Sequence, residues 1–157
     1  MEFSKLAGVF DKLSSKTKRL DLASDLAKLF ASAGKSEVKQ LAYLCQGRLL
    51  PEHVGIELGI GDKLAEQAIA KVAGRRQVDV EASYRKTGDL GETARLLLSA
   101  RQQTTLSEGG KLTVEKVYSN LYKLATSSGS GSQGQKVSLL AELLNSSSPS
   151  EGSRRCG

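Results

Sequence analysis

The strongest constraint on the fold is a helix–turn–helix pattern in the segment 112–144. A run rich in glycine and serine, 127–134, interrupts the helical pattern, because glycine adopts positive φ without steric cost and serine favours turns. A second apolar stripe begins at Val137 and continues to Leu144. The segment therefore predicts two helices joined by a tight turn. The first of them has apolar residues at helical spacing: Val114, Val117, Tyr118, Leu121, Leu124 and Ala125.

Helical spacing of apolar residues recurs earlier in the chain, over residues 2–13, about 17–33, 37–46 and 64–72, the last of which Asp62 is expected to cap. A further helix is expected after Asp89, since Asp89 and Glu92 have the spacing of a capping box. Leu, Ala, Lys and Glu are frequent and there are two prolines, a composition that favours helices. We therefore expect an all-α fold. Its predicted core contains Leu26, Phe30, Leu41, Leu44, Ile69, Leu97, Val117, Leu121 and Leu140.

The start of the helix after the 127–134 turn is a candidate anion site. Backbone N–H groups of a first helical turn lack intrahelical partners and lie at the positive end of the helix dipole. We expect Lys136 in that first turn. A second glycine turn, 59–61, precedes the helix at Asp62, with Lys63 close by. A Gly/Ser turn between helices is often only a connection, so this pattern alone leaves both interpretations open.

Composition sets looser limits. The net charge of +6 suits a polyanionic partner but does not identify one. His53 is the one histidine and has no neighbouring cluster of metal ligands, so neither a metal nor a catalytic role is expected. Cys45 and Cys156 do not form the pattern of a disulfide scaffold. Without a signal peptide or a run of ~20 apolar residues, the chain is expected to be soluble and cytoplasmic.

Three segments are informative when taken in order. The first is GIELGIGD at 55–62, followed by Ala68-Ile69-Ala70; the second is Tyr84-Arg85 with Thr87-Gly88-Asp89-Leu90-Gly91. The third comprises Leu112, Thr113, Val114, Val117, Tyr118, Ser128, Gly129, Gly131, Ser132, Gln133 and Lys136. Together they resemble the N-terminal DNA-binding domain of archaeal and eukaryotic ATP-dependent DNA ligases.

This resemblance implies an all-α domain over residues 1–151, built as two pseudo-symmetric halves. It implies a grip on nicked duplex DNA through the minor groove and backbone, largely without reading sequence. It also implies the ligase's catalytic domains in cis, ATP and Mg²⁺ as cofactors of the full-length enzyme but not of this chain, and work in replication and repair near the nucleoid. The resemblance and, for Lys63, its place beside the 59–61 turn give the predicted DNA-binding residues: Gly59, Gly61, Lys63, Arg85, Ser128, Gly129, Gly131, Ser132, Gln133 and Lys136.

The sequence departs from the family at its end. After Ser150-Glu151 the family continues with an apolar helix, whereas here GSRRCG follows. The second half is therefore expected to be incomplete, with 152–157 disordered, as after a frameshift or premature stop. No Lys-x-Asp-Gly occurs, so no lysine is expected to carry AMP and the chain should not seal nicks alone.

Two alternatives remain open from the sequence. One is a helical protein-interaction module, whose binding would hardly depend on salt. The other is a small enzyme with an unrecognised site, which the lack of His, Cys or carboxylate clusters disfavours.

Overall fold

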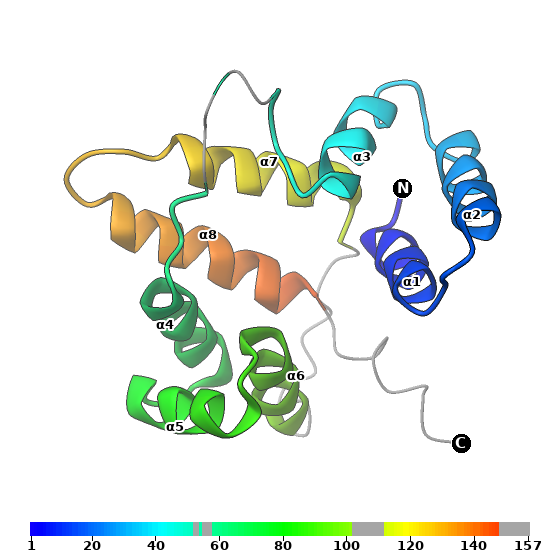
Figure 1. The fold of residues 1–157 in the computed structure, drawn as a ribbon. Helices are drawn as coiled ribbons and strands as arrows, with labels where there is room; N and C mark the ends of the chain where they lie inside the picture. Colours follow the sequence, from blue (N-terminus) through cyan, green and yellow to red (C-terminus); the bar gives the residue numbers. More distant parts are fainter. Residues whose placement is uncertain (52–53, 55–57, 102–111, 148–157) are drawn as a thin grey trace. The chain divides into compact units, whose positions relative to one another are not determined.

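The structure, a computed structural model, describes residues 1–51, 54, 58–101 and 112–147 (Figure 1). Within these ranges the chain forms eight α-helices and no sheet, which confirms the predicted all-α class. None of these helices is both long and apolar enough to cross a membrane. The helices are α1 (Phe3–Ser14), α2 (Arg19–Ala31), α3 (Val38–Cys45), α4 (Asp62–Ala73), α5 (Gln77–Thr87), α6 (Leu90–Arg101), α7 (Val114–Thr126) and α8 (Ser132–Ser146).

The chain divides into two compact units that are not consecutive in sequence. Unit 1 consists of Met1–Ile56 and Leu112–Tyr122, and unit 2 of Glu57–Lys111 and Lys123–Gly157. Unit 1 therefore holds α1, α2, α3 and the start of α7, whereas unit 2 holds α4, α5, α6, the end of α7 and α8.

The core of unit 1 joins its two sequence segments. Backbone hydrogen bonds tie the chain start to the start of α7: the N–H of Val114 donates to the carbonyl of Met1 (3.0 Å), and that of Phe3 to the carbonyl of Leu112 (2.8 Å). The Tyr118 hydroxyl donates to the carbonyl of Leu49. The buried side chains of this core are Leu6, Leu29, Leu41 and Val114.

In unit 2, α4 is the central helix. It packs most extensively on α8 and also contacts α5 and α6 (Figure 1). Its inward face is built largely from alanine and β-branched residues, which let neighbouring helices approach closely. Apolar burial of this kind contributes roughly 25 cal/mol per Å². The buried residues of this core are Ile69, Ala70, Val72, Ala73, Val80, Ala94, Leu98 and Ala141.

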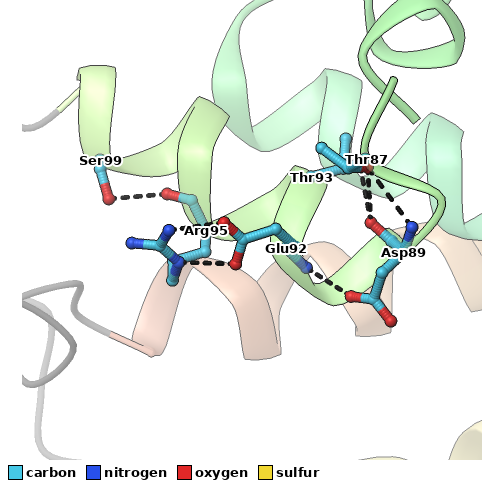
Figure 2. A network of polar contacts seen from close by, with 6 residues as sticks. All are labelled: Thr87, Asp89, Glu92, Thr93, Arg95 and Ser99. Atoms are coloured by element: carbon cyan, nitrogen blue, oxygen red, sulfur yellow. Dashed lines mark hydrogen bonds and ion pairs between the residues drawn. The ribbon is translucent and has the colours of Figure 1, made fainter. Parts of the chain in front are cut away.

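The start of α6 is fixed by the polar network in Figure 2. Oδ1 of Asp89 accepts the N–H of Glu92 at 2.6 Å, and the hydroxyl of the fully buried Thr93 donates to the carbonyl of Asp89 at 2.8 Å. The predicted capping box is only half formed. The Glu92 carboxylate binds Arg95 instead (Nε to Oε2, 2.8 Å), and the N–H of Asp89 turns to the Thr87 hydroxyl.

Three of the nine predicted core residues, Leu41, Ile69 and Val117, are buried. The other six are partly buried, because each helix of so small a unit has one side near solvent. Phe30 and Leu44 nevertheless pack against the core of unit 1, and Leu97 against that of unit 2.

Helix α5 was not expected from the sequence. Among its residues only Val80 is buried, and Val78 is 68% exposed, so the segment lacks a regular apolar stripe. The glycines on either side of it are clearer signals. Gly74 closes the preceding helix α4 and Gly88 closes α5, both in left-handed geometry. The predictions made for His53, for 55–57 and for the tail 152–157 lie outside the described residues.

Candidate functional site

Both glycine turns lie in unit 2, and each precedes a helix. Gly61 is the N-cap of α4, and Gly131, with φ +85°, is the N-cap of α8. Gly59 (φ +57°) and Gly129 (φ +92°) also occupy the left-handed region, where residues with a Cβ are strained. The sequence placed Asp62 as the cap of its helix; it is instead the first helical residue.

Helix α8 begins five residues before the apolar stripe that was used to predict it. Gly134, expected to shape the turn, lies inside the helix and does not have positive φ. Lys136 is consequently the fifth residue of α8. The prediction that it lies in the first turn of this helix was wrong. The first turn, which includes Gln133, is polar and largely exposed. Hydrophobic periodicity marks only the point where a helix starts to bury apolar side chains.

Lys136 brings the two turns together. Its ammonium donates to the carbonyl oxygen of Leu58 (3.3 Å) and to that of Gly59 (3.4 Å), which lies 77 residues earlier in the chain. The loop before α4 and the start of α8 are therefore neighbours within unit 2. This contact could not be predicted from the sequence, because every residue has a backbone carbonyl and the residue types do not show which carbonyl accepts the hydrogen bond.

The two helix starts differ in their electrostatics. The first turn of α8 contains no acidic residue, so none of its own side chains places a negative charge at the positive end of the helix dipole. The first turn of α4 contains Asp62, which accepts a hydrogen bond from the Tyr84 hydroxyl at 3.4 Å. The Asp62 charge raises the pKa of Tyr84. Of the two, the start of α8 offers an anion the better environment.

The two other predicted basic residues have different surroundings. The Lys63 ammonium lies 2.5 Å from Oε1 of Glu81 and 3.3 Å from Oε2 of the buried Glu66. The hydrogen bond from Lys63 holds the pKa of Glu81 below its ordinary value, and Arg85 contributes to the same shift. Arg85 itself is exposed on the last turn of α5. Lys63 thus neutralises carboxylates of its own unit, whereas Arg85 presents its charge to solvent.

An uncapped first turn does not by itself distinguish these helices. The side chain of the N-cap residue makes no cap hydrogen bond in α1, α2, α3 or α5 either. What distinguishes the start of α8 is the combination of a glycine turn, the absence of acidic residues in its first turn, and the nearby ammonium of Lys136. Within the described ranges, no group of His, Cys, Asp or Glu could hold a metal ion.

Two alanine substitutions in this turn should have opposite effects. Gly131→Ala places a Cβ at φ +85° and should lower the free energy of unfolding by about 1–2 kcal/mol, the usual cost of left-handed geometry. Gly134→Ala lies in the helix with no atom within 4 Å of the added Cβ, and should raise it by about 0.5–1 kcal/mol. Urea denaturation of both variants checks this. Equal effects would contradict the described start of α8.

Comparison with known proteins identifies the chain's relatives. Residues 2–153 match the family described as DNA ligase N terminus. The chain is 42% identical over 153 residues to the DNA ligase of Nitrosopumilus maritimus and 43% over 150 to that of Cenarchaeum symbiosum. It is 40% identical over 157 residues to DNA ligase 2 of Thermofilum pendens. These alignments cover 98%, 95% and 96% of this chain but 26%, 25% and 26% of the relatives. The chain thus spans about a quarter of their length.

Proposed function

The chain belongs to the DNA ligase N-terminus family, and from that premise we propose that it binds duplex DNA through the phosphate backbone without reading base sequence. The observation that carries the proposal is the start of α8, a glycine-capped first turn with no acidic residue and with Lys136 close by. Backbone N–H groups at such a helix start suit a phosphate oxygen.

The predicted residues divide into groups with different parts in this proposal. Ser128, Gly129, Gly131, Ser132 and Gln133 form the turn and first residues of α8, where a phosphate can approach the backbone closely. Four of the five are exposed and Ser132 is partly buried, so DNA can approach this surface without unfolding unit 2.

The remaining predicted residues contribute in other ways. Arg85 adds an exposed charge on α5, and Gly59 and Gly61 shape the loop that Lys136 contacts. Lys63 takes part only by leaving Glu81 and Glu66, because its ammonium is already paired with both carboxylates. We therefore propose a smaller contribution from Lys63 than from Arg85 or Lys136.

Contacts of this kind favour sequence-independent binding. Backbone N–H, serine and lysine groups that meet phosphates position a protein on the duplex but carry no direct information on bases. We also propose that the chain approaches DNA from the minor groove, as the resemblance implies, and that groove distinguishes the base pairs poorly.

The proposal extends to the catalytic domains with which this chain would act. We propose that the chain acts with the catalytic domains of an ATP-dependent DNA ligase in cis, on nicked duplexes formed in replication, repair and recombination, in the cytoplasm and at the nucleoid. ATP and Mg²⁺ would serve those catalytic domains. In this chain the described residues contain no group suited to a metal, and the sequence contains no Lys-x-Asp-Gly.

Two duplexes of equal length and unrelated sequence test the proposal. Their dissociation constants, measured by fluorescence anisotropy at 50 mM salt, should agree within about twofold, because phosphate contacts are common to every sequence. A preference of tenfold or more for one duplex would contradict backbone binding. If neither duplex binds, the helical protein-interaction module becomes the better interpretation.

A further inference from the structure

We propose that Lys136 is a positioning residue that ties the loop before α4 to α8, so that the two glycine turns form one phosphate-binding surface. This inference deepens the proposed function and rests on it. Its basis is the pair of hydrogen bonds from the Lys136 ammonium to the carbonyls of Leu58 and Gly59.

The ammonium group has one donor more than these two bonds use. A lysine ammonium has three N–H donors and no acceptor, and two of them serve the carbonyls at 3.3 and 3.4 Å. The third remains for an anion. In the part of the chain that the structure describes, the ammonium contacts carbonyls and no carboxylate, unlike that of Lys63. Its full positive charge is therefore held in place without being neutralised.

Gly59 is suited to this contact for two separate reasons. Its φ of +57° belongs to the left-handed region, and a Cβ added to it would lie 2.8 Å from Nζ of Lys136. Any side chain at this position must therefore displace the ammonium. Gly74 provides a comparison within the same unit: its φ is +63°, yet an added Cβ would meet nothing within 4 Å. The two glycines share the backbone requirement, and only Gly59 has the close approach.

The tether is tested first without DNA, on the whole 157-residue chain. In Lys136→Met, ¹⁵N order parameters of Gly59, Ile60 and Gly61 should fall from the rigid value of about 0.85 towards a flexible value below about 0.6. The matched control is Arg75→Met, which also removes one positive charge. Arg75 follows the C-terminal end of α4, whereas Gly61 is the N-cap at the other end of this 12-residue helix. The helix is about 18 Å long at 1.5 Å per residue, so the loop should stay rigid.

The effect on binding is measured with the same variants. Loss of one phosphate contact lowers affinity about eightfold at 0.1 M salt, taking a salt slope of 0.9 per phosphate and 1 M salt as reference. Lys136→Met should reach that loss, and Arg75→Met should fall well short of it. Gly59→Ala should weaken binding as well. Combining it with Lys136→Met should cause little further loss of affinity, since both substitutions remove the same contact. Gly74→Ala should leave affinity unchanged.

The outcomes separate this inference from the proposed function. A loop that stays rigid in Lys136→Met, or additive losses for Gly59→Ala and Lys136→Met, would overturn the positioning role even if the chain binds DNA well. A loop that loosens in a chain that binds no duplex would uphold the tether while refuting the phosphate surface, and with it the proposed function.

Discussion

Replacing Leu41 with alanine is expected to lower the free energy of unfolding by about 2–5 kcal/mol, the range found when a large buried aliphatic side chain is truncated. Leu41 is 0% exposed and packs with Leu6, Leu29 and Val114 in the core of unit 1. Three separate helices and the start of a fourth meet at this cluster. The cavity left by the missing methyl groups is lined by side chains that their helices hold in place, so it should collapse only partly.

Leu20 provides the matched control. Leu20→Ala is the same substitution in the same unit, but the Leu20 side chain, on α2, is 85% exposed. Leu20→Ala should therefore stay within about 0.5 kcal/mol of the parent chain, as surface substitutions usually do. Urea denaturation followed by circular dichroism measures both. Similar losses for the two variants would mean that the described core of unit 1 is wrong.

The helices that the sequence predicted are those with a broad apolar face. Leu29 and Leu41 lie on such faces and are buried as the spacing requires. Helix α5 escaped prediction because Val80 is its one buried residue and Val78 points to solvent. The start of α8 was placed too late for a related reason: the residues from Ser132 to Lys136 form helix without burying an apolar stripe.

The candidate site was predictable only in part. The glycine turns could be placed before helices, since glycine at a turn and an apolar stripe beyond it are local signals. The partners of the two lysines could not be predicted. Lys63 binds Glu81, 18 residues away on α5, and Lys136 binds two carbonyls of a distant loop. Such partners follow from how helices pack in unit 2, which residue spacing does not specify.

The affinity for duplex DNA is expected to fall steeply as the salt concentration rises. Each phosphate neutralised by a protein contributes about 0.9 to the slope of log affinity against log salt concentration. The start of α8 with Lys136, together with the exposed Arg85, supplies at least two such contacts in the proposed function. The slope should then be about −1.8 or steeper, and a tenfold rise in salt should weaken binding roughly sixtyfold.

A protein-interaction module would respond differently. If the lysines and arginines only solvate the surface, raising the salt screens interactions that contribute little, and affinity for a protein partner hardly changes. The net charge of +6 is common to both accounts, so charge alone does not separate them. The response of duplex binding to salt does.

In the proposed function, this chain binds duplex DNA through phosphate contacts centred on the start of α8. The most direct test measures the dissociation constant of a labelled nicked duplex from 50 to 500 mM salt, for the parent chain and for Lys136→Met. We expect a slope of log affinity against log salt of about −1.8 or steeper for the parent chain, and a slope about 0.9 shallower for the variant. A slope near zero, or the same slope for both proteins, would contradict the proposed function.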